Sequence, residues 1–156
     1  MTDLFPLVLL GVAAGLIASA VMEAFQALAA TPFGQTGGGD SATVKLADRI
    51  SIALTGAPVT QKRRARAGQV VHYVTGIALG IVYVVAAADW PTITLWFGVA
   101  YGIGVAIVLD YIVVPALGLG PPAWKTPPAT HAYGLLSHAV FGAALQAARE
   151  IGFLLF

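Results

Sequence analysis

Long apolar stretches constrain this chain more than any other feature of its sequence. A helix that crosses the hydrocarbon core of a bilayer needs about 20 predominantly apolar residues. Only 10% of the 156 residues are charged, whereas soluble domains carry about 25%. Four stretches meet or approach the length of a span, and the only charged side chains in them are Glu23 and Asp110: residues 4–30, 68–88, 91–114 and 131–148. The sequence therefore predicts an all-α integral membrane protein, with one membrane domain over residues 1–156 that forms a four-helix bundle.

The stretch at residues 4–30 is expected to be a retained transmembrane helix. A signal peptide has a basic start, an apolar centre and a small-residue cleavage site. Here no Lys or Arg precedes the apolar stretch, and Glu23 and Gln26 interrupt its far end. These features argue against cleavage.

Composition also limits the class of function. The chain has no cysteine, so disulfides and thiolate metal sites are excluded. Its formal net charge is +1, and this argues against a nucleic-acid partner, which requires a concentrated basic surface. No hydrolase, zinc-protease, phosphate-loop or dinucleotide motif occurs, so an enzyme is disfavoured.

The basic residues predict the orientation in the membrane. Lys and Arg in short loops stay on the cytoplasmic side. The loop at residues 31–67 holds six of the eight basic residues and the loop before residue 131 holds Lys125, whereas only Arg149 lies on the other side. Both termini are therefore expected outside the cytoplasm, with lipid around the spans.

The cytoplasmic loop is expected to contain a short interfacial helix. Apolar residues recur at helical spacing between Ser41 and Thr55, with Asp40 or Ser41 as a cap and Gly56 at the end. The basic run at residues 62–66 follows this helix. It is interpreted as a topology determinant, with contact to anionic lipid or a partner protein as the alternative.

Two helices share a sequence pattern. Residues 11–23 read GVAAGLIASAVME and residues 98–110 read GVAYGIGVAIVLD, so five of thirteen positions are identical. This predicts an internal duplication, with two similar transmembrane hairpins in parallel orientation. The alternative is chance similarity between two helices that draw on few residue types. Small residues let helix backbones approach closely in lipid, and the predicted packing positions are Gly11, Gly15, Gly76, Gly80, Gly98, Gly102, Gly134 and Gly142.

Polar residues of all four helices are expected in the cytoplasmic half of the bundle. The predicted cluster consists of Glu23, Gln26, His72, Asp110, His131 and His138. A charge inside the membrane costs about 2.5–3.5 kcal/mol on insertion scales, so it normally faces a partner or water. The duplication would bring Glu23 and Asp110 together near the bundle centre.

Several interpretations of this cluster stay open. One is a divalent metal site that uses Glu23, His72, Asp110, His131 and His138. A second is a proton relay between carboxyl and imidazole groups, and a third is a haem b held by the histidines. In a fourth, the groups only hold helices together, in a homo-oligomer or a subunit of a larger membrane complex. A non-enzymatic, ion-linked membrane protein is the leading hypothesis.

Three segments resemble a known family. These segments, HYVTGIALGIVY, FGVAYGIGVAIVLDYIVVPALGLGPP and HAYGLLSHAVFG, lie within about the last 90 residues. They are similar to the YagU-like inner-membrane proteins, small multi-span bacterial proteins without an assigned biochemistry. The resemblance implies a location in the bacterial inner membrane and carries no mechanism.

Overall fold

The structure, a computed structural model, describes residues 4–35 and 39–155, and every regular element in these ranges is helical. This confirms the all-α class. The long helices are α1 (Leu4–Ala29), α2 (Ala42–Thr55), α3 (Arg64–Asp89) and α6 (Pro128–Leu155). A continuous helical segment between α3 and α6 consists of α4 (Val99–Ala106), the π-helix η3 (Ile107–Val113) and α5 (Val114–Ala116). Three short 3-10 turns complete the described part: η1 (Gln61–Arg63), η2 (Pro91–Thr94) and η4 (Ala123–Lys125).

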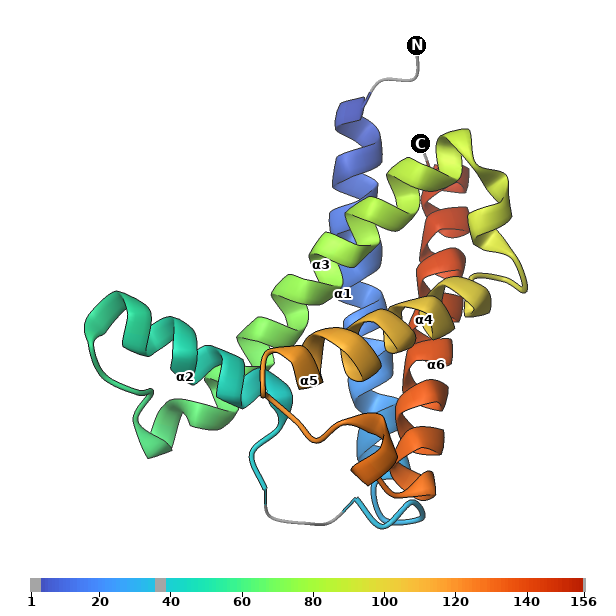
Figure 1. Cartoon of the computed structure of the whole chain (residues 1–156). Helices are drawn as coiled ribbons and strands as arrows, with labels where there is room; N and C mark the ends of the chain where they lie inside the picture. Colours follow the sequence, from blue (N-terminus) through green and yellow to red (C-terminus); the bar gives the residue numbers. More distant parts are fainter. Residues whose placement is uncertain (1–3, 36–38, 156) are drawn as a thin grey trace.

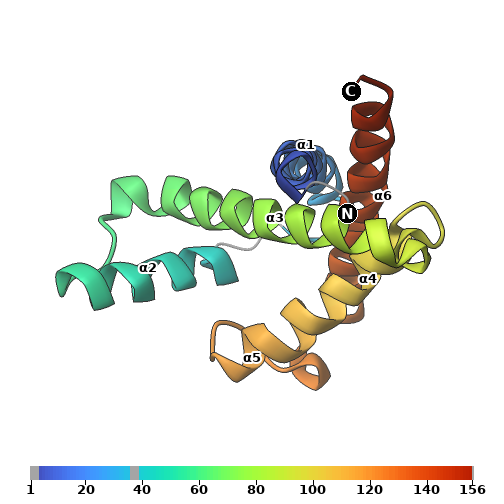
Figure 2. The same cartoon turned by 90° about the horizontal axis from the view of Figure 1, so that it is seen from above.

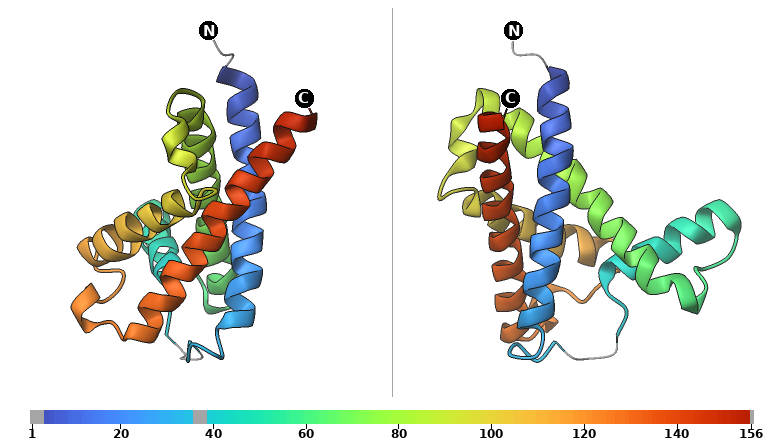
Figure 3. Two further views of the ribbon diagram at one scale, coloured as in Figure 1. Left: turned by 90° about the vertical axis from the view of Figure 1, so that its right-hand side faces the viewer. Right: turned by 180° about the vertical axis from the view of Figure 1, so that it is seen from behind.

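The helix α1 lies at the centre of the fold. It packs against α3 on one side and α6 on the other, while α2 packs on α3 and α4 packs on α6 (Figure 1). Seen from above, α2 and the beginning of α3 project away from α1 and α6 (Figure 2). The start of α1, the end of α6 and the turn after α3 lie at one end of the molecule (Figure 3).

Glycines set the contact between α1 and α3. Gly11 faces the backbone of Gly80 and Ile81, and Gly15 faces that of Gly76. A Cβ atom on either α1 glycine would overlap the backbone of α3. The helices therefore meet backbone to backbone, as small-residue seams allow in membranes.

The same kind of contact joins α4 and α6. A Cβ atom on Gly102 would overlap the carbonyl of His138, and one on Gly142 would overlap the carbonyl of Gly98. Gly134 faces Asp110 further along the same two helical segments. All eight glycines singled out in the sequence thus lie at contacts between helices.

The third predicted helix does not begin where expected. Pro91 opens only the 3-10 turn η2, and the helix starts at Val99. Trp96, Phe97 and Gly98 separate the two with φ of 54°, 57° and 78°. Three successive left-handed residues cannot continue a right-handed helix, so the prediction of one helix over residues 91–114 is wrong at its start.

The end of that segment has wider helical turns. The N–H of Val114 bonds to the carbonyl of Leu109, five residues earlier. Pro115 follows directly and lacks the N–H that an α-helix would use there. The π-helix contains Asp110, and such turns occur frequently at functional sites.

Three described segments are long and apolar enough to cross a membrane: Leu4–Ala29, Gln61–Asp89 and Val99–Ala116. A membrane protein is therefore supported. The helix α6 is longer than the expected residues 131–148. It is not one of these three segments, because it carries polar and charged residues such as His138, Gln146 and Glu150. The segment from α4 to α5 runs across α6 rather than alongside it (Figure 1), so the structure does not confirm a four-helix bundle.

The loop helix α2 forms as its caps predict. The Ser41 hydroxyl accepts from the N–H of Val44 at 3.3 Å, and Gly56 ends the helix with φ of 77°. The guanidinium of Arg64 then ties α2 to α3 through carboxylate oxygens of Asp40 at 2.6 Å and Asp48 at 2.5 Å. One member of the basic run therefore has a structural role.

Candidate functional site

One cavity of about 850 Å³ lies between α1, α2, α3, η3 and α6. The six residues of the predicted polar cluster all line it: Glu23, Gln26, His72, Asp110, His131 and His138. Those side chains are half-buried, except for Asp110, whose side chain is 42% exposed. Asp110 thus lies at the open edge of the cavity rather than in the bundle centre.

Glu23 on α1 is held by two neutral donors from α3. The Gln69 amide donates to one carboxylate oxygen at 2.6 Å, and the Tyr73 hydroxyl donates to the other at 2.7 Å. Gln69 and Tyr73 are four residues apart and share one helix face. The carboxylate is thereby oriented, while neither partner offsets its charge.

Asp110 on η3 faces His138 on α6. One Asp110 carboxylate oxygen lies 3.5 Å from Nδ1 of His138, whose side chain is 12% exposed. The same nitrogen lies 3.0 Å from the carbonyl oxygen of Gly134. Because both neighbours are acceptors, Nδ1 carries the hydrogen, and Nε2 is left to accept or take up a proton.

The other two histidines also have backbone partners. Nε2 of His72 lies 3.4 Å from the carbonyl of Ser19, and Nε2 of His131 lies 3.1 Å from the carbonyl of Ala123. The His131 ring also stacks on Tyr111, with ring centres 5.1 Å apart. Each imidazole is thus fixed through one nitrogen.

The predicted metal site is not supported. Within the described residues no group of three or more His, Cys, Asp or Glu side chains is arranged to hold a metal ion. The physical reason is that the two carboxylates are directed to different partners: Glu23 to Gln69 and Tyr73, and Asp110 to His138. The residues share a cavity but do not converge on one point.

Sequence reasoning missed the partners of Glu23 and a second polar pair. Tyr83, which is fully buried, donates to the amide oxygen of Gln146 at 2.6 Å, and the amide nitrogen of Gln146 donates to Glu150 at 2.8 Å. A glutamine in the middle of α6, four residues before Glu150, was a usable signal.

Comparison with known proteins adds a family but no activity. Neither the curated proteins nor the solved structures give a match. One family matches residues 44–147, which include α3, α4, η3 and most of α6, and its description is "Protein of unknown function (DUF1440)". Since the match covers about two thirds of the chain, this protein belongs to the DUF1440 family.

Proposed function

We propose that the chain is a multi-pass protein of the bacterial inner membrane that binds a small solute, without enzymatic chemistry, in the cavity between α1, α3 and α6. The observation that carries this proposal is the gathering of six polar side chains from separate helices around one cavity of about 850 Å³. That volume falls in the range of small-molecule sites, about 300–1,000 Å³. The YagU-like resemblance fits the same location.

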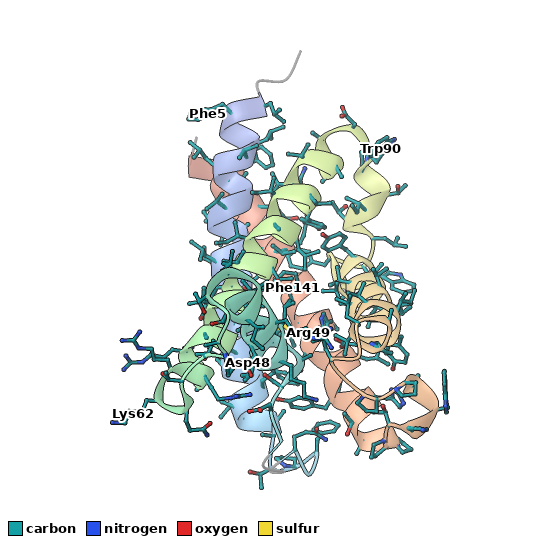
Figure 4. The ribbon with its side chains drawn as sticks, turned by 60° about the vertical axis from the view of Figure 1, so that its left-hand side comes forward. Phe5, Asp48, Arg49, Lys62, Trp90 and Phe141 are labelled. Atoms are coloured by element: carbon teal, nitrogen blue, oxygen red, sulfur yellow. The ribbon has the colours of Figure 1, made fainter. Side chains whose placement is uncertain are left out.

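The charge distribution supports an orientation with the cavity toward the cytoplasm. Phe5 and Trp90 lie toward one end of the molecule, and Lys62 lies toward the other (Figure 4). Lys62 belongs to the basic loop that the positive-inside rule assigns to the cytoplasm. With that assignment both termini face outward.

The packing supports the proposed duplication. Gly11 and Gly15 meet Gly80 and Gly76 on α3, and the equivalent Gly98 and Gly102 meet α6 at Gly142 and His138. Gly80 and Gly142 are separated along the chain by as many residues as Gly76 and His138. Glu23 and Asp110 then continue each seam toward the cavity.

We propose that the Asp110 and His138 pair exchanges protons with water in the cavity. The pair combines a carboxylate at the open edge with an imidazole whose Nε2 is available. The other titratable groups that line the cavity are Glu23 on α1, His72 on α3, Tyr111 on η3, and His131 and Tyr133 on α6. An imidazole beside a carboxylate can act as a proton shuttle.

Single-cysteine variants test the cavity. The chain has no cysteine, so Thr75→Cys, which lines the cavity, and its neighbour Val74→Cys, at a position 59% exposed on the outer face, can be compared directly. We expect the neutral reagent methyl methanethiosulfonate to modify Thr75→Cys faster than Val74→Cys, because a thiol in lipid does not ionise. Slower reaction of Thr75→Cys would show a dry bundle in which the polar groups only hold helices together.

Infrared spectra test the proton exchange. On acidification we expect a change in a carboxyl band that disappears in Asp110→Asn and shifts in His138→Gln. Asp89→Asn, at the opposite end of α3, is the control. A spectrum without an Asp110 band would remove the proton exchange from the proposal.

A further inference from the structure

The charged side chains that line the cavity are acidic, whereas basic side chains lie around it. Glu23 and Asp110 both line it, and no described lining residue is Lys or Arg. The chain nevertheless has eight basic residues, and several lie nearby. Arg49 donates instead to the carbonyl of Leu117, and Arg64 pairs with Asp40 and Asp48.

The carboxylate of Glu23 is oriented but not neutralised. Its two bonds come from the uncharged Gln69 and Tyr73. In a cleft with low-dielectric walls, uncompensated charge of one sign concentrates ions of the opposite sign. The cavity therefore favours a positively charged ligand.

The aromatic side chains that line the cavity indicate which kind of cation it binds. Tyr111, Tyr133 and Phe141 line the same cavity, together with the imidazole of His131. Ring faces attract organic ammonium groups, quaternary ammonium above all. A bare metal ion is disfavoured, because no described group of three ligands is arranged for it.

From these observations we infer that the cavity binds a small organic ammonium ion, with Glu23 and Asp110 as its countercharges and the aromatic residues against its apolar part. This inference rests on the proposed solute-binding function. The ammonium group belongs either to a soluble amine or to an amine headgroup of a lipid.

The first test compares two thiol reagents on Thr75→Cys in neutral detergent. One carries a trimethylammonium group and the other a sulfonate group of similar size. Because the ionised fraction of the thiol is common to both, their rate ratio reports the local potential. We expect a ratio about tenfold above that of Thr92→Cys, in the exposed turn η2. It should fall in Glu23→Gln and in Asp110→Asn.

The second test uses benzyltrimethylammonium, its neutral analogue neopentylbenzene, and benzenesulfonate, each titrated into the detergent-solubilised protein by calorimetry. We expect saturable binding of the cation only, weakened about tenfold by Glu23→Gln, since each 1.4 kcal/mol is a factor of ten. Asp89→Asn should bind like the wild type. The same cation is then titrated into the protein in nanodiscs. If its binding is lost in nanodiscs that contain phosphatidylethanolamine but is kept in nanodiscs of phosphatidylglycerol alone, the natural ammonium group belongs to a lipid headgroup. An unchanged signal in both would identify a soluble amine.

The two proposals fail in different ways. If the neutral reagent modifies Thr75→Cys but the charged reagents give the same rate ratio as with Thr92→Cys, the cavity exists and the ammonium assignment is wrong. Binding of benzenesulfonate in place of the cation would also overturn it. If the neutral reagent does not modify Thr75→Cys, the solute cavity itself is wrong. Gel filtration of each variant confirms that it is folded.

Discussion

The hydroxyl of Tyr83 on α3 donates a 2.6 Å hydrogen bond to the side-chain amide of Gln146 on α6. Both residues are buried. These two helices otherwise touch little, since both pack mainly on α1 and the beginning of α3 leads away from α6 (Figure 2). The pair therefore links the two outer helices directly.

Removal of this bond should destabilise the fold. In Tyr83→Phe the buried amide oxygen of Gln146 loses its donor, which costs about 1–3 kcal/mol. Thermal unfolding in detergent measures the loss, and a double-mutant cycle with Gln146→Met isolates the pair. Additive effects in that cycle would contradict a direct link.

A methyl group on Gly102 should separate α4 from α6. Its Cβ would overlap the carbonyl of His138, whereas a Cβ on Gly104 meets nothing within 4 Å. Gly102→Ala should lower the unfolding temperature, while the matched variant Gly104→Ala should gain about 1 kcal/mol from helix propensity. Equal behaviour of the two variants would show that α4 does not rest on α6.

Trp96→Gly should relieve backbone strain. Trp96 has φ of 54° and is 72% exposed, so glycine removes a left-handed penalty of about 1–2 kcal/mol and loses little packing. We expect a higher unfolding temperature. Trp90→Gly, at a residue with φ of −125°, is the control and should not stabilise. A destabilised Trp96→Gly would argue against the left-handed turn.

The clamp of Arg64 should protect the hairpin of α2 and α3. Arg64→Gln loses both ion pairs to Asp40 and Asp48, so limited proteolysis should cut the connection at residues 56–60 faster. Arg63→Gln, at the exposed neighbouring position, should be cut at the wild-type rate. Equal rates would show that the clamp does not hold the hairpin.

Reporter fusions should reveal the orientation. A reporter after Phe156 should be active only when exported, and one inserted near Gly38 only in the cytoplasm, because the basic loop remains inside. The reverse pattern would move the cavity to the outer leaflet. The arrangement of the residues around the cavity would be the same in either orientation.

The sequence predicted the parts of the fold that depend on local chemistry. The apolar stretches located α1 and α3, and the caps at Ser41 and Gly56 located α2. The glycine pattern located the contacts of Gly15 and Gly102. Each depends on residues that are close in sequence.

The break before α4 and the pairing of Tyr83 with Gln146 could not be predicted in this way. Tryptophan and phenylalanine rarely adopt positive φ, so the local preferences of Trp96 and Phe97 do not predict the left-handed turn at these residues. The partner of a buried tyrosine depends on which helices meet, and a sequence pattern does not fix that. The positions of the polar residues along the predicted spans were enough to predict that they gather in one half of the protein. The hydrogen-bond partner of each residue is seen only in the structure.

The π-helix of residues 107–113 has a consequence for how this segment tolerates changes in length. A bond that reaches back five residues encloses one residue more than an α-helical bond, so the turn behaves like a single inserted residue. Deletion of Val108 would remove that extra residue and let the segment close into a regular α-helix, and the side chains before and after the π-helix would keep their relative orientation. Gly102 would then keep its contact with α6, whereas the same deletion in a regular α-helix would rotate the two parts by about 100°.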